Sequence, residues 1–88
     1  MDINTEDLKK KIIYRSTYRG TKEMDALLSS FTKKNINKLN VGELINLSNL
    51  LDIDDENLYK FNQGLPTTVN IEENKVSKLF KQFTYNKK

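Results

Sequence analysis

Apolar residues recur at helical spacing along most of the chain. Four groups share the spacing that places side chains on one face of a helix: Leu8, Ile12 and Ile13; Met24, Leu27, Leu28 and Phe31; Leu44, Leu47, Leu50 and Leu51; and Val76, Leu79, Phe80 and Phe83. An alternation of period two, which would indicate a strand, is weakly present only over residues 67–71. The pattern predicts an all-α protein whose leucines and phenylalanines, Phe61 included, form the core.

Capping and breaking residues set the limits of the predicted helices. Asn40 followed by Glu43 is a capping box, and Asp54 is a further N-cap. Gly64 suits the left-handed position that ends a helix, and Pro66 prevents continuation. We expect helices over residues 5–17, 21–34, 40–52, 54–63 and 71–83, and a frayed tail over 84–88. With short connections, these elements predict a compact five-helix bundle, a single small domain over residues 1–88.

The composition argues against most enzyme mechanisms. A chain of 88 residues makes one domain with a small core. It contains no Cys and no His. It therefore lacks a thiolate nucleophile, a disulfide and the side chain that most often transfers protons near neutral pH. We expect no catalytic residues and a protein that is not an enzyme.

Two features bear on metal binding and on location. The run from Asp52 to Asn57 resembles the start of a calcium-binding loop, but the places that require Gly and Glu hold Asn57 and Gln63. No metal site is predicted. No segment approaches the roughly 18 apolar residues of a membrane span, and the polar, acidic N-terminus does not read as a secretory signal. We expect a cytoplasmic protein without membrane insertion.

The charge is mildly basic, at +3 with a pI near 9.1. Lys33, Lys34 and Lys38 cluster at the end of the second predicted helix, where cations favour the helix dipole and where phosphate contact is the alternative. The helix over 40–52 carries no Arg, Lys or Gln, the residues that commonly read base edges. A small basic nucleic-acid-binding protein is therefore the weaker alternative, and no nucleic-acid partner is expected.

Arginine is distributed unevenly. The chain has 13 Lys and two Arg among its 15 cations, and both arginines, Arg15 and Arg19, lie just before Gly20. Arg differs from Lys in its planar fork, which binds carboxylates and stacks on aromatic rings such as those of Tyr14 and Tyr18. Two interpretations remain open. Arg19 forms an exposed pair with Glu23 four residues later, worth about 0.2–1 kcal/mol, or the guanidinium groups serve recognition.

The same stretch resembles a known family. Residues 12–28 with Phe31 resemble the signature of the succinate dehydrogenase flavinylation factors, also called FAD assembly factors, whose motif is R-G-x-x-E. Arg19, Gly20 and Glu23 match that motif. A second region is similar to the family at Leu50-Leu51-Asp52, Asp55, Leu58, Tyr59 and Phe61. Two positions depart from the family pattern: Tyr18 stands where a basic residue is usual, and Thr21 stands where Met is usual.

The resemblance implies a five-helix chaperone rather than a catalyst. Such factors bind the flavoprotein subunit of succinate dehydrogenase, or of fumarate reductase, and promote covalent attachment of FAD to that client. By this resemblance the chain is expected to bind no cofactor tightly and to act on the FAD of its client. We also expect a monomer. The alternative is a generic helical protein-interaction module with another partner.

The resemblance also implies a partner-binding surface made of six residues: Arg19, Gly20, Glu23, Arg15, Tyr14 and Tyr18. In the expected arrangement Arg19 points outward to the client, and Gly20 allows the client backbone to approach closely. Glu23 either orients Arg19 or accepts from a donor of the client. Tyr14 fits either the edge of this surface or the core.

Overall fold

The computed structural model describes residues 4–84, and this part of the chain contains helices and the loops between them. The α-helices are α1 (Thr5–Thr17), α2 (Lys22–Asn35), α3 (Val41–Leu50), α4 (Asp55–Gln63) and α5 (Lys75–Gln82), and a short 3-10 helix, η1 (Ile36–Lys38), follows α2. The predicted all-α fold with five helices in one small domain is confirmed. Of the tail expected to fray, residues 85–88 lie outside the described residues.

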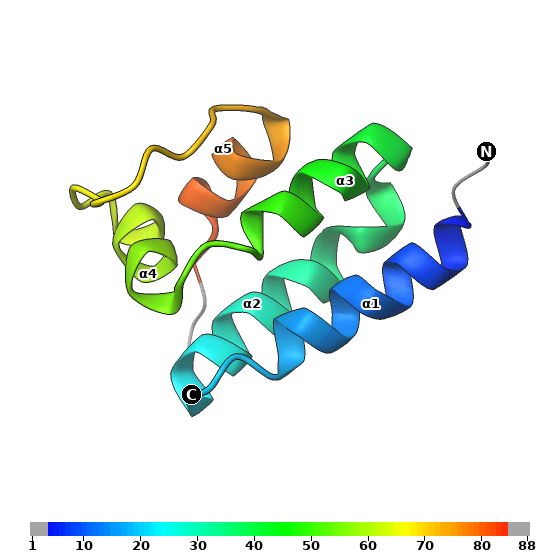
Figure 1. The fold of residues 1–88 in the computed structure, drawn as a ribbon, viewed down its shortest axis with the longest axis horizontal. Helices are drawn as coiled ribbons and strands as arrows, with labels where there is room; N and C mark the ends of the chain where they lie inside the picture. Colours follow the sequence, from blue (N-terminus) through cyan, green and yellow to red (C-terminus); the bar gives the residue numbers. More distant parts are fainter. Residues whose placement is uncertain (1–3, 85–88) are drawn as a thin grey trace.

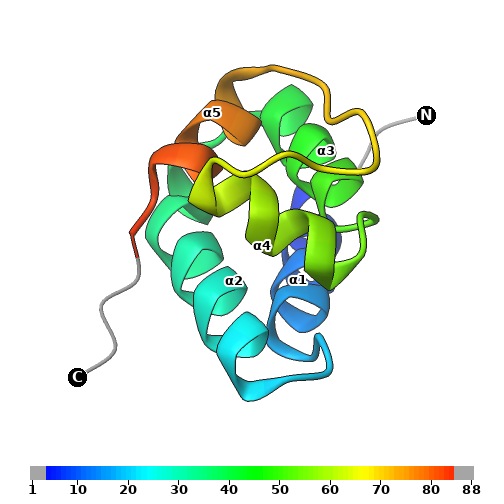
Figure 2. The ribbon, with the colours of Figure 1, turned by 90° about the vertical axis from the view of Figure 1, so that its left-hand side faces the viewer.

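The helices form two groups joined by α3. Figure 1 shows α1 and α2 running side by side in opposite directions. The helix α3 packs against α1 on one side and against α5 on the other. The helix α4 packs on α5. Figure 2 shows α4 between α5, above it, and the α1–α2 turn, below it. The fold therefore brings the start of α4 close to a turn that lies far away in sequence.

Every helix contributes to one apolar core. Its buried members are Ile12, Met24, Leu27, Leu28, Phe31, Ile36, Leu39, Leu44, Leu47, Leu50, Leu51, Leu58, Val76 and Phe80. The ring of Phe31 meets those of Phe80 and Phe83 edge-on, with centroids 5.2 and 5.4 Å apart, a preferred aromatic geometry. The stripes of α2 and α3 are buried as predicted. In the stripe predicted for α1, Ile12 is buried but the side chain of Ile13 is 39% exposed.

The helix ends follow their capping residues. Asn40 and Glu43 form the predicted capping box, and Gly64 ends α4 with a φ of +76°. The last helix begins at Lys75 rather than at residue 71, so that expected boundary is wrong. Asn74 and Ser77 form a reciprocal capping box there, in which each side-chain oxygen accepts from the other residue's backbone N–H. This cap leaves the preceding residues in the loop.

Candidate functional site

The turn between α1 and α2 is ordered by its own hydrogen bonds. Thr21 caps α2, its hydroxyl oxygen accepting from the backbone N–H of Met24 at 3.2 Å. The carboxylate of Asp25 accepts from the backbone N–H groups of Arg19 and Gly20. Gly20 adopts a φ of +130°, a region that side chains with a Cβ rarely enter. These hydrogen bonds and the conformation of Gly20 together define the backbone path between α1 and α2.

The Arg19 side chain turns inward to the connection between α3 and α4. Its Nε donates to Asp55 Oδ1 at 2.8 Å, Nη1 donates to the Leu51 carbonyl at 2.7 Å, and Nη2 donates to the Ile53 carbonyl at 2.7 Å. The side chain is only 11% exposed. All three nitrogens of the guanidinium thus have partners within the molecule, and the Arg19–Asp55 pair joins the α1–α2 turn to the first turn of α4.

Arg15 makes a similar set of contacts one helical turn earlier. Its Nη1 donates to the Ser48 hydroxyl at 3.0 Å and to the Ser48 carbonyl at 3.3 Å, and its Nη2 pairs with Asp52. The last carbonyls of a helix lack partners within it and carry the negative end of its dipole. The two arginines therefore cap the C-terminal end of α3, with Arg19 bonded to the Leu51 carbonyl and Arg15 to that of Ser48.

The expectation of an outward Arg19 paired with Glu23 is wrong. Arg19 lies in the turn, before α2 begins at Lys22, so the four-residue spacing does not place it beside Glu23 on a helix face. Its carboxylate partner is Asp55, 36 positions away in sequence. Arg15 likewise bonds residues of its own chain, Ser48 and Asp52. Both arginines hold elements of this chain together, a role that the sequence analysis did not assign to them.

Gly20 has a reason to be glycine within the chain itself, besides the client approach expected from the resemblance. A Cβ at this position would lie 3.8 Å from Asp55 Oδ2, which is an ordinary contact. The space around Gly20 therefore does not require glycine, whereas its φ of +130° does. Gly20 fixes the direction in which the chain enters α2, and so the position of Glu23.

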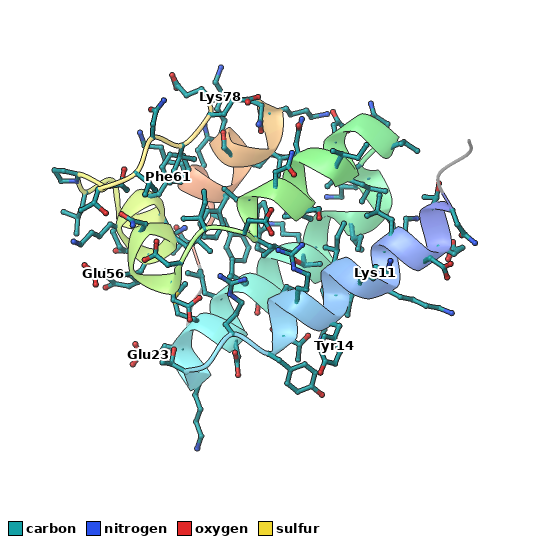
Figure 3. All side chains as sticks on the ribbon, in the orientation of Figure 1. Lys11, Tyr14, Glu23, Glu56, Phe61 and Lys78 are labelled. Carbon is teal, nitrogen blue, oxygen red and sulfur yellow. The ribbon has the colours of Figure 1, made fainter. Side chains whose placement is uncertain are left out.

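The remaining predicted residues lie on the surface. Glu23 is exposed in the first turn of α2, and its carboxylate has no hydrogen bond or ion pair with another residue of the 4–84 range. Tyr14 and Tyr18 are 66% and 68% exposed, and their ring centroids are 4.7 Å apart. Figure 3 shows Tyr14 pointing away from the bundle and Glu23 at the end of the molecule that also carries Glu56. Tyr14 is therefore part of the surface and not of the core.

Two carboxyl groups at the starts of α3 and α4 have pKa values below their ordinary range. The side-chain amide and backbone N–H of Asn57 donate to Asp54 and lower its pKa, and the backbone N–H of Asn40 does most to lower the pKa of Glu43. Both are capping carboxylates, so these shifts belong to helix ends rather than to catalysis. They stabilise the starts of α3 and α4 near neutral pH.

The lysine cluster at the end of α2 lies on the surface. Lys33, Lys34 and Lys38 are exposed, and the Lys34 ammonium lies 5.8 Å above the Phe83 ring, so this charge also covers apolar surface. Within the described helices, none combines the length and the apolarity of a membrane span.

The sequence did not predict the two carbonyl partners of Arg19, those of Leu51 and Ile53, because no side-chain pattern marks a backbone acceptor.

Comparison with known proteins places the chain. The family model described as flavinator of succinate dehydrogenase matches residues 10–84. Two relatives are named succinate dehydrogenase assembly factor 2, mitochondrial. The one from Dictyostelium discoideum is 39% identical over 56 residues, covering 64% of this chain and 40% of the relative. The one from Meyerozyma guilliermondii is 39% identical over 54 residues, covering 61% of this chain and 40% of the relative.

The matched segment is thus well under half of either relative's length. No solved structure matches the chain. The family match extends over most of the sequence and includes the turn formed by Arg19, Gly20 and Glu23. The chain belongs to the family of flavinators of succinate dehydrogenase.

Proposed function

We propose that the chain is an assembly factor that binds the flavoprotein subunit of succinate dehydrogenase, or of fumarate reductase, and promotes covalent attachment of FAD to it. The observation that carries the proposal is the hydrogen-bonded R-G-x-x-E turn in a member of the flavinator family. The names of the two relatives support a role in succinate dehydrogenase assembly.

The contacts with the client are assigned to exposed groups. Glu23 offers an unpaired carboxylate, and the Tyr14 and Tyr18 rings offer an aromatic surface of the kind enriched at protein interfaces. Arg19 and Gly20 act as positioning residues, because they fix the turn from which Glu23 projects. Arg15 holds the α1 segment that carries both tyrosines.

The chain acts on the conformation of its client rather than on bonds. It has no His and no Cys, so the groups that form the flavin bond belong to the client and to FAD. Binding favours the client conformation in which the flavin and the accepting side chain are close together, which raises the rate by orienting the reactants. In this proposal a monomer acts without binding free FAD tightly. A cytoplasmic location remains part of the proposal; the two relatives are named mitochondrial.

Co-expression tests this function directly. The flavoprotein subunit is produced with and without the chain, and covalently bound flavin is measured by its fluorescence in a denaturing gel. Flavin fluorescence that rises severalfold with the chain supports the proposal. Equal fluorescence in both samples, with both proteins present in comparable amounts, contradicts it.

A further inference from the structure

A groove of roughly 630 Å³ runs between α2, α4 and the end of α5. Its walls contain the apolar or aromatic side chains Met24, Ala26, Leu27, Tyr59 and Phe83. Figure 2 looks onto this side of the molecule, with α4 facing the viewer, α5 above it and α2 below and to its left. The groove thus lies on the same side as the first turn of α2, which carries Glu23.

The groove continues toward the start of α4 through a smaller hollow. Glu23, Met24 and Tyr59 line both, and the smaller one adds Asp55 and Glu56. Together they form one depression, which we call the α2–α4 groove. Its middle is lined by apolar and aromatic side chains beside the amides of Asn62 and Gln63. Its end near the start of α4, which we call the acidic end, carries three carboxylates, with Lys22 next to Glu23.

Charge differs between the two ends of the α2–α4 groove. Glu23 and Glu56 lie with the cation Lys22 at the end near the start of α4, and Lys81 lies at the end near Phe83, where no carboxylate of the described residues lines the groove. Of the two glutamates, Glu56 is bonded to Lys60 at 2.9 Å, whereas Glu23 has no side-chain partner among residues 4–84. An occupant with a basic group at the first end therefore complements the groove, and Glu23 is the carboxylate free to receive it.

The Arg19–Asp55 pair holds the two walls of the groove in register. Asp55 belongs to the α4 wall, and Arg19 immediately precedes the segment that enters the α2 wall. Because the pair is largely buried, the acidic end keeps its shape before any partner binds. A preformed groove loses less conformational entropy on binding than one that must first be ordered.

We infer that the α2–α4 groove receives a segment of the flavoprotein client that is apolar in its middle and carries a basic residue at the Glu23 end. This inference rests on the proposed function and assigns part of the client contact to a second surface beyond the Tyr14 and Tyr18 face. Tyr59, which is 48% exposed on the groove wall, is its aromatic anchor.

Photo-cross-linking from position 59 tests the occupant. Tyr59 is replaced by p-benzoylphenylalanine, the variant is mixed with the flavoprotein subunit and irradiated, and the linked peptides are identified by mass spectrometry. Leu65 is the matched control, because it is a large apolar residue of similar exposure, 52%, just past α4 and outside the groove lining. The expected result is a cross-link from position 59 to a client peptide that contains apolar residues and a Lys or Arg, with little from position 65.

Binding measurements with truncated side chains complete the test. Tyr59→Ala is expected to weaken binding of the flavoprotein subunit about fivefold or more, and Leu65→Ala to leave it unchanged, with circular dichroism confirming that both fold. Cross-links from position 59 to a second copy or to residues 85–88 of the chain itself overturn the groove assignment. So does unchanged client binding by Tyr59→Ala.

The two proposals fail in different ways. If the wild-type chain does not bind the flavoprotein subunit, both the proposed function and the groove assignment fall. If the wild type binds and raises covalent flavin while the position-59 variants behave like those at position 65, only the groove assignment falls.

Discussion

Arg19 Nε lies 2.8 Å from Asp55 Oδ1, and this contact joins the α1–α2 turn to the first turn of α4. The two side chains are 11% and 27% exposed, so water weakens their attraction less than it would for a surface pair. The remaining guanidinium nitrogens bond the carbonyls of Leu51 and Ile53. The arginine of the R-G-x-x-E motif thus holds the α1–α2 turn against the connection between α3 and α4.

Replacing Arg19 should destabilise the protein. In Arg19→Ala the Asp55 carboxylate loses its ion-pair partner and two carbonyls lose a donor, so we expect a loss of about 2–3 kcal/mol in the free energy of unfolding. Arg19→Lys keeps the charge but offers no planar fork, and should recover only part of that loss. Urea unfolding followed by circular dichroism measures both.

Arg15→Ala is the matched comparison for this effect. The Arg15 side chain is 35% exposed and its partner Asp52 is 69% exposed, so its loss should be smaller, about 0.5–1.5 kcal/mol. Equal stability of Arg19→Ala and wild type would show that the Arg19–Asp55 pair does not hold the turn in solution.

Two glycines should respond to alanine with opposite signs. Gly20→Ala places a Cβ at a φ of +130° and should destabilise the fold by about 1–2 kcal/mol, although the space around it is sufficient. Gly42 lies in the first turn of α3, where a Cβ meets only Asn40 Oδ1 at 3.5 Å. Gly42→Ala should therefore stabilise, by up to about 1 kcal/mol. Thermal unfolding of both variants checks the signs, and a stabilised Gly20→Ala would contradict the strained turn.

Local signals predicted the helices well because helices are built from local contacts. The stripe from Met24 to Phe31 is buried, and the Asn40 and Glu43 capping box forms as read from the sequence. The start of α5 was misplaced because Ser77, rather than Glu or Gln, completes the box with Asn74. Serine at this position does not by itself indicate a capping box in a sequence, although its hydroxyl completes one in the structure.

The candidate site was less predictable because its contacts are not local. The uneven use of arginine marked Arg15 and Arg19 as unusual, but spacing suggested Glu23 as the partner of Arg19. The true partner, Asp55, is 36 positions away in sequence and is brought close only by the tertiary packing of α4. The α2–α4 groove likewise joins side chains from three helices, so no single segment of sequence could reveal it.

Stability should fall in acid, in part through the cap of α4. Hydrogen bonds from Asn57 lower the pKa of Asp54 from its ordinary 3.8, so the folded protein binds fewer protons there than the unfolded chain. The stabilisation is therefore present above pH 3.8 and is lost as the pH falls through the lower folded value. In Asp54→Asn the cap persists without the charge. The advantage of wild type over this variant in urea unfolding should shrink below about pH 4, and a constant difference would contradict the lowered pKa.

The exposed tyrosine pair should affect function more than stability. The double variant Tyr14→Ala/Tyr18→Ala removes two surface rings and should lower the free energy of unfolding by less than about 1 kcal/mol. Covalent flavin in the co-expression assay should fall severalfold, because the rings are assigned to client contact. Val69→Ala, in an exposed part of the α4–α5 loop, is the control and should retain full flavin attachment. Unchanged flavin in the double variant would remove the tyrosines from the client surface.

Glu23 can be separated from general helix effects by comparison with Glu6. Both carboxylates lie in the first turn of a helix, so Glu23→Gln and Glu6→Gln lose a similar dipole interaction, about 0.3–1 kcal/mol. Only Glu23 borders the α2–α4 groove and belongs to the R-G-x-x-E turn. We therefore expect similar stabilities but a marked fall in covalent flavin and client affinity for Glu23→Gln alone. Because Arg19 bonds Asp55 instead, such a loss would come from a contact made by Glu23 itself, and equal flavin levels in the two variants would show that its carboxylate does not face the client.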